Sequence, residues 1–91
     1  MKIRWTTGAT ADLESISDHI AEDNPEAALK TVRSIFARVE ELTTFPRRAP
    51  MGREEGTREL VLSPLPYIAV YRVTEDVVEI LYFWHGAQNR E

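Results

Sequence analysis

In the second half of the chain, apolar positions gather in short segments that are typical of β-strands. Two of these segments, residues 67–73 and 77–84, are separated only by the polar residues 74–76. So short a gap turns an antiparallel pair back on itself, which predicts a β-hairpin. A further segment, residues 58–63, precedes the hairpin across two prolines, which remove backbone donors and interrupt the ladder. The segments together predict three consecutive strands.

The first half of the chain begins with a short strand and then changes to helical spacing. Residues 2–5 alternate polar and apolar side chains, and Thr6 or Thr7 can cap a helix that begins near Gly8. Asp12 is expected toward the positive end of this helix, among solvated acids. An apolar stripe recurs at intervals of four, three and four residues and consists of Ala9, Leu13, Ile16 and Ile20.

A second helix is expected to begin at Asn24-Pro25, because Asn caps well and Pro loses no hydrogen bond at the first helical position. Pro46 prevents this helix from continuing past Phe45. Residues 46–57 contain two prolines and two glycines and predict a loop. The apolar stripe of the second helix, widened by Phe36, consists of Ala28, Val32, Ile35, Val39 and Leu42. The order strand, helix, helix and three strands predicts one α+β two-layer domain over residues 1–91.

Alternation along the two long strands predicts which side chains share a face of the sheet. It leaves Arg72 within an apolar segment, where its guanidinium must reach water, an anion or a carboxylate. In the last strand it places Leu81 and Phe83 on one side and Trp84 on the other. Both sides are mostly apolar, and a pair of helices covers only one face. The uncovered face is therefore expected to be a groove or a partner surface.

Composition and charge exclude several classes of function. The chain has no cysteine and two histidines, so we expect no disulfide, no metal site and no cofactor. Its formal net charge of −4 argues against direct binding to DNA by this chain alone, although basic residues gather in its middle. Apolar runs are too short to span a bilayer and the first residues lack a secretory pattern, so a cytoplasmic location is expected.

Three side chains are candidates for catalysis. His85 ends the last strand, and beside Arg58 or Arg72 it could act as general acid or base in phosphodiester cleavage while an arginine stabilises the developing charge. The alternative is a structural histidine that anchors the end of the chain. The loop arginines, Arg53 among them, form either an anion-binding patch or ordinary solvated charges.

The order of short motifs along the chain resembles the RelE/ParE superfamily of toxins from bacterial type II toxin-antitoxin systems. The resemblance covers nearly the whole chain. It implies a helical hairpin packed on a mainly antiparallel four-stranded sheet, in the order β-α-α-β-β-β. The motifs that carry it are Trp5-Thr6, Ala9, Asp12-Leu13, Asn24-Pro25, Ala27-Ala28, residues 58–61, residues 66–73, residues 78–81 and residues 85–88.

The superfamily has two activities, and the resemblance is closer to one of them. RelE-like members cut messenger RNA on the ribosome, which here would involve Arg58, Arg72 and His85, whereas ParE-like members inhibit DNA gyrase. RelE-like nucleases are strongly basic and carry an arginine where this acidic chain has Ile68. We therefore expect a ParE-like gyrase inhibitor without enzymatic chemistry. A ribosome-dependent endoribonuclease and a low-potency module that acts as corepressor with its antitoxin are the alternatives.

The resemblance also implies a protein partner, a co-encoded antitoxin whose C-terminal part wraps the toxin along its groove. Such a partner would explain the surplus apolar surface on the sheet. Many ParE-like chains carry a basic residue where this one has a glutamine near its end. The residues expected at partner surfaces are Leu81, Phe83, Tyr71, Arg53, Gln88 and Arg90.

Overall fold

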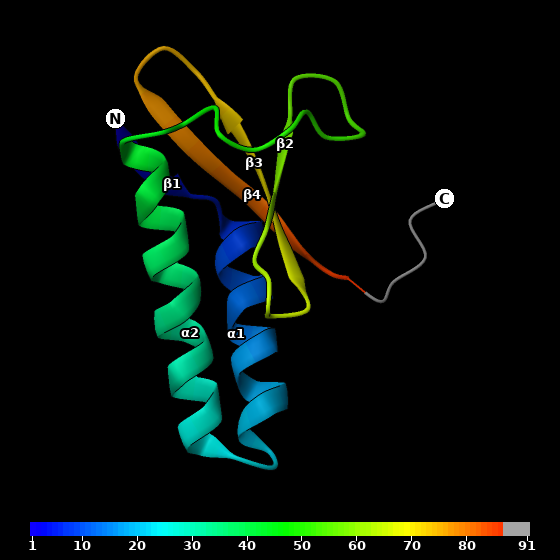
Figure 1. The fold of residues 1–91 in the computed structure, drawn as a ribbon. Coiled ribbons are helices and arrows are strands. Elements are labelled where there is room, and N and C mark those ends of the chain that lie inside the picture. Colours follow the sequence, from blue (N-terminus) through cyan, green and yellow to red (C-terminus); the bar gives the residue numbers. More distant parts are fainter. Residues whose placement is uncertain (87–91) are drawn as a thin grey trace.

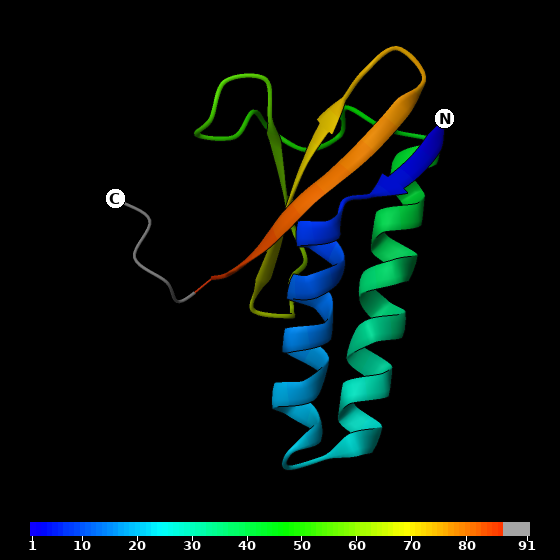
Figure 2. The same ribbon diagram turned by 180° about the vertical axis from the view of Figure 1, so that it is seen from behind.

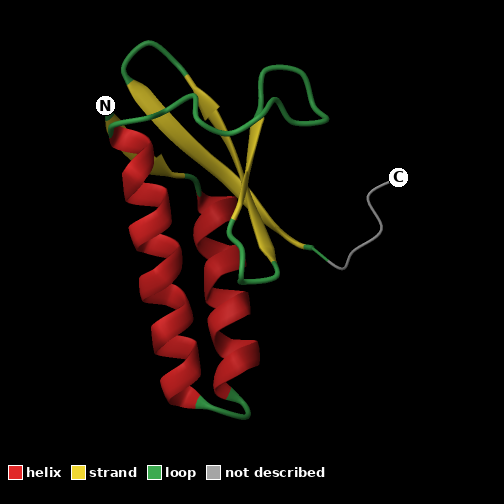
Figure 3. Ribbon diagram, in the orientation of Figure 1, coloured by secondary structure: helices red, strands yellow, loops and turns green. Residues whose placement is uncertain are grey.

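The computed structural model describes residues 1–86, and it has the expected order of elements (Figures 1 and 3). The elements are β1 (Lys2–Trp5), α1 (Thr7–Ala21), α2 (Pro25–Glu40), the short 3-10 helix η1 (Glu41–Thr43), β2 (Arg58–Val61), β3 (Tyr67–Val73) and β4 (Val77–His85). The strands form one sheet in the order β1-β4-β3-β2. Only β1 and β4 run parallel, so the predicted mainly antiparallel α+β fold is confirmed.

Both helices begin at the residues that their sequences predict. The Thr6 hydroxyl oxygen accepts from the Ala9 amide at 3.2 Å, and the Asn24 side chain accepts from the Ala27 amide at 3.1 Å. Thr6 also donates its hydroxyl to the Ile80 carbonyl at 2.7 Å, which fixes the start of α1 against β4. Helix α2 ends at Glu40. The chain then continues as the tighter 3-10 helix η1, which ends before Pro46.

Asp12 does not have the position expected for it. It is half-buried, and its Oδ2 accepts from the Phe83 backbone amide at 3.0 Å. It therefore ties α1 to the end of β4 instead of facing solvent near the helix start. Its partner lies 71 residues away in the sequence, so local spacing could not have indicated the contact.

One face of the sheet, which we call the covered face, packs against the two helices. Its strand residues Ala69, Tyr71, Val78 and Ile80 are fully buried, and they meet buried side chains of the hairpin such as Ile35. Burial of this apolar surface is the main stabilising contribution in a fold of this size. Figures 1 and 2 show that the far end of the helical hairpin projects beyond the sheet, so the sheet does not pack against that end of the helices.

The opposite side of the sheet is the open face, and a bulge in β4 changes which residues of this strand belong to it. Tyr71 pairs with Ile80 and Val70 pairs with Tyr82, so the residue between the two partners, Leu81, is extra. A bulge of this kind shifts the alternation by one residue. The strict alternation predicted for this strand is therefore wrong beyond Ile80, and Phe83 points into the core.

Candidate functional site

The three residues considered for RNA cleavage do not come together. Arg58 pairs with Tyr71 across the sheet, whereas His85 pairs with Tyr67, four residues further along β3. At about 3.3 Å per residue, that difference separates the two by roughly 13 Å. Arg72 follows Tyr71 in β3 and so lies on the open face, away from Arg58. The predicted catalytic set is thus spread over both faces and both ends of the sheet.

Arg58 and Arg72 are moreover engaged within the chain. The Arg58 guanidinium donates to the backbone carbonyls of Arg47 at 3.3 Å and Ala49 at 2.7 Å. The Arg72 guanidinium donates twice to the Glu79 carboxylate, each time at 3.2 Å. His85 is exposed and lies edge-on to the Tyr67 ring, with 5.4 Å between the ring centroids. A phosphate that approached either arginine would have to displace these contacts first.

Glu79 lies between two arginines on the open face. Its carboxylate contacts Arg4 of the neighbouring strand β1 as well as Arg72 of β3. The hydrogen bond from Arg4, followed by that from Arg72, holds the pKa of Glu79 below its ordinary value, because both bonds favour the charged form. The three charges form an ion network across three strands. Of the partners expected for Arg72, which were water, an anion or a carboxylate, the structure provides a carboxylate.

Aromatic side chains occupy the other part of the open face. Tyr82 and Trp84 lie at an angle to each other, with ring centroids 5.9 Å apart. The loop before β2 reaches over them, since Glu54 accepts a hydrogen bond from the Tyr82 hydroxyl and Arg53 lies 5.7 Å above the Trp84 ring. Burial, and then the Glu54 contact, raises the pKa of Tyr82. The loop thus closes part of the surface that the sequence leaves apolar.

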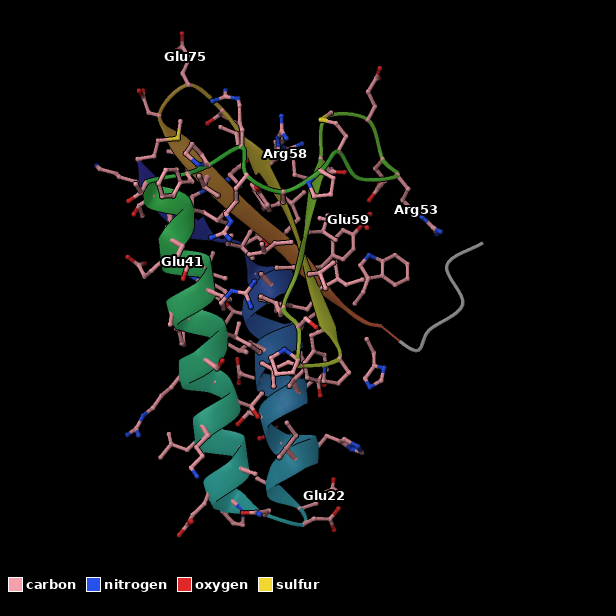
Figure 4. All side chains as sticks on the ribbon, viewed as in Figure 1. Glu22, Glu41, Arg53, Arg58, Glu59 and Glu75 are labelled. Carbon is pink, nitrogen blue, oxygen red and sulfur yellow. The ribbon has the colours of Figure 1, made fainter. Side chains whose placement is uncertain are left out.

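The residues expected at partner surfaces have different positions in the structure. Arg53 is exposed, and Figure 4 shows it extending away from the loop. Leu81 is half-buried at the bulge. Tyr71 and Phe83 are 0% and 9% exposed and belong to the core, so their expected surface position is wrong. Gln88 and Arg90 lie outside the described residues.

A further apolar surface lies on the helical hairpin, where sequence reasoning did not expect one. Leu29 and Phe36 of α2 remain 52% and 44% exposed. Phe36 lines an apolar groove of about 370 Å³ between the helices, together with Thr10, Leu13, Glu14, Ser17 and Val32. The signal was present in the sequence, because Leu29 falls outside the stripe that α2 turns toward the sheet. An amphipathic helix is the element that such a groove accommodates best.

Among residues 1–86, no three His, Cys, Asp or Glu side chains are grouped so that they could hold a metal ion. Within the same residues, no helix has the length and apolar character needed to cross a membrane.

Comparison with known proteins gives consistent matches over nearly the whole chain. The profile of a family described as the ParE toxin of the type II toxin-antitoxin system parDE matches residues 3–90. The candidate toxin Y4kP of Sinorhizobium fredii is 42% identical over 87 residues, which cover 96% of this chain and 90% of that protein.

Solved structures match as well. A chain of the chromosomal ParDE system of P. aeruginosa superposes with a TM-score of 0.84 at 33% identity, covering 93% of this chain and 95% of that one. A chain of the toxin-antitoxin complex RelBE2 of Mycobacterium tuberculosis gives a TM-score of 0.62 at 26% identity, covering 92% and 95%.

Proposed function

This chain belongs to the ParE toxin family of type II toxin-antitoxin systems, and on that premise we propose that it arrests bacterial growth by binding DNA gyrase. A cognate antitoxin is its partner in such a system, since the solved structures that it resembles are of toxin-antitoxin systems. In this proposal the chain has no catalytic chemistry of its own. It acts through surfaces that bind other proteins, in the cytoplasm where gyrase is found.

The observation that carries the proposal is the dispersal of Arg58, Arg72 and His85. Cleavage of a phosphodiester requires a general base and a cation placed within hydrogen-bond reach of the same reacting group. Here the two arginines lie on opposite faces of the sheet, and each is bound to groups of the chain itself. Inhibition by binding needs no such convergence, and a net charge of −4 does not oppose it.

We propose that the antitoxin binds in the groove of the helical hairpin through an amphipathic helix and extends toward the half-buried Leu81. The exposed apolar side chains of α2 support this assignment, because a partially exposed aromatic beside a groove is a typical anchor site in protein interfaces. Phe36→Glu places a charge in the groove and is expected to weaken antitoxin binding about tenfold or more. Ser34→Glu, which adds the same charge at an exposed position of α2, is the matched control.

The affinity for the antitoxin is measured by isothermal titration calorimetry and compared between the unaltered toxin, Phe36→Glu and Ser34→Glu. The CD spectrum confirms that each variant is folded. Equal affinity for Phe36→Glu and for the unaltered chain would place the antitoxin elsewhere on the toxin.

The gyrase proposal is tested by supercoiling of relaxed plasmid with purified gyrase, while the antitoxin-free chain is titrated into the reaction. The expected result is inhibition that increases with toxin concentration and is reversed by added antitoxin. A folded chain that leaves supercoiling unchanged would contradict the proposal. Mapping of messenger ends in a translating extract would then test the ribosome as the target.

A further inference from the structure

The segment after η1 presents an aromatic side chain to solvent at one end of the molecule. Phe45 is 63% exposed, although it is large and apolar. It borders a shallow hollow of about 640 Å³ that residues 44–48 line by themselves. We call these five residues the Phe45 surface. An exposed phenylalanine beside a hollow is more typical of a protein interaction site than of a hydrophobic core.

Side chains of the covered face hold the backbone of this surface in place. The Tyr71 hydroxyl donates to the Pro46 carbonyl at 2.8 Å, and the Arg58 guanidinium donates to the Arg47 carbonyl at 3.3 Å. Inside the segment, the Arg48 amide donates to the Phe45 carbonyl at 3.2 Å. The sheet therefore orders the loop before any partner arrives. A surface ordered in this way loses less conformational entropy on binding than a flexible loop.

The Phe45 surface also carries a positive charge that the described residues leave without a counter-ion. Arg48 is paired with Glu41, with 2.5 Å between the guanidinium and carboxylate atoms. Glu41 is the first residue of η1 and lies three residues before this segment in the chain. The Arg47 guanidinium is exposed and makes no hydrogen bond or ion pair with residues 1–86. Although the net charge of the chain is −4, Arg47 gives this surface a local positive charge.

On the basis of the gyrase function proposed above, we propose that the Phe45 surface is where the toxin docks on gyrase, by binding an acidic peptide segment. A carboxylate of that segment pairs with Arg47, and an adjacent apolar side chain packs on Phe45 in the hollow. Charge complementarity of this kind fixes partner choice and speeds association. A DNA backbone fits less well, because phosphate binding uses several free cations and gains nothing from an exposed phenylalanine.

The Phe45 surface is separate from the groove assigned to the antitoxin. Phe36 lines that groove, and Phe45 follows it by nine residues, most of them helical. At a rise of about 1.5 Å per residue, nine residues correspond to roughly 14 Å along the helix axis. Substitutions at one surface can therefore be examined without disturbing the other.

Two substitutions test the proposal in the supercoiling reaction. Arg47→Glu reverses the unpaired charge, and Phe45→Ala removes the exposed ring; neither side chain is buried, so both variants should fold. Each is expected to raise the concentration for half-inhibition about tenfold or more, because like charges or a lost anchor weaken docking. Arg33→Glu makes the same charge change at an exposed position of α2 and should leave inhibition unchanged. Arg47→Glu and Phe45→Ala should retain antitoxin affinity, measured by calorimetry.

Each alternative outcome has its own meaning. If the unaltered chain inhibits gyrase and both variants inhibit equally well, the docking inference is wrong while the gyrase function stands. If the unaltered chain does not inhibit, the gyrase function fails and the docking inference fails with it. Loss of inhibition by Arg47→Glu alone, with reduced binding to a fluorescent 20-base-pair duplex, would replace the acidic peptide by DNA. If the unaltered chain is dimeric by analytical ultracentrifugation and Arg47→Glu is monomeric, a second copy is the occupant.

Discussion

The two faces of the same sheet differ in what their side chains contact. On the covered face, residues such as Tyr71 and Ile80 are fully buried against the helices. On the open face, the same strands carry the Arg4-Glu79-Arg72 network and the aromatic pair beneath the loop. Apolar burial is the main source of stability in small domains, so stability should depend far more on the covered face. The open face and the loops are then free to contact partners.

The bulge at Leu81 determines which of the consecutive aromatic residues at the end of β4 faces the core. Phe83 stacks on Trp5, with ring centroids 5.7 Å apart, and joins the core. Trp84, the next residue, lies on the open face under Arg53. These two neighbours in sequence are therefore a natural pair for testing the difference between the faces.

The largest expected effect comes from Phe83→Ala, which should lower the free energy of unfolding by about 3–5 kcal/mol because it leaves a cavity in the core. Trp84→Ala should lower it by only about 1–2 kcal/mol, through lost contacts to Tyr82 and Arg53. Urea denaturation followed by far-UV CD measures both values. Equal losses in the two variants would contradict the assignment of the two rings to different faces.

Gly52→Ala is expected to have an intermediate effect, on the loop that closes over the open face. A Cβ at this position would lie 2.5 Å from the Thr57 hydroxyl oxygen, which is held by its own bond to the Glu54 carbonyl at 2.7 Å. Relief of that overlap should cost about 1–3 kcal/mol in the free energy of unfolding. Gly56 has a φ of +79° but open space around it, so Gly56→Ala tests backbone strain without overlap. An unchanged midpoint of urea denaturation for Gly52→Ala would show that the loop is looser than described.

A smaller, pH-dependent effect is expected from Glu79→Gln. The pKa of Glu79 is lowered on folding, so the unfolded chain binds more protons at this position over the range between the two values. The stabilising contribution is therefore complete above the ordinary pKa of 4.5, and it is lost as the pH falls through the lower, folded value. The difference in unfolding free energy between wild type and Glu79→Gln should shrink accordingly as the pH is lowered from 7. A difference that stays constant down to pH 2 would show that the ion network does not stabilise the fold.

The smallest effect is expected from Tyr82→Phe, which removes only the hydroxyl that donates to Glu54 at the edge of the open face. Because Glu54 is exposed and can turn to water, the loss should be at most about 1 kcal/mol. Tyr71→Phe is the matched change on the covered face, where the part-buried hydrogen bond to the Pro46 carbonyl is lost. Thermal unfolding should show a larger decrease in Tm for Tyr71→Phe, and the reverse order would contradict the comparison.

Much of the fold could be predicted from the sequence because its signals are local. The caps at Thr6 and Asn24, the limits of β3 and the hairpin turn all follow from spacing and turn residues. The bulge could not be predicted, because β4 is apolar on both sides. The alternation of polar and apolar residues therefore does not show which face of the sheet Phe83 belongs to.

The candidate site was harder to predict, since its decisive contacts join residues far apart in sequence. The sequence makes Arg58 a candidate for catalysis and Tyr71 a candidate for partner binding, yet their polar atoms hold loop carbonyls 9 to 25 residues away. Arg72 needs water, an anion or a carboxylate, and the structure supplies the carboxylate of Glu79 from the next strand. Spacing shows that a charge requires a partner, but only the register of the strands shows which one it has.

We propose that this toxin acts by binding gyrase and not by cutting RNA. This mechanism is tested most directly by brief induction of the chain in growing cells, with plasmid topoisomers and transcript ends measured from the same culture. A gyrase inhibitor should give relaxed or cleaved plasmid while transcripts remain intact, and His85→Ala should give the same result. Normally supercoiled plasmid with codon-positioned cleavage of messengers, lost in His85→Ala, would contradict it.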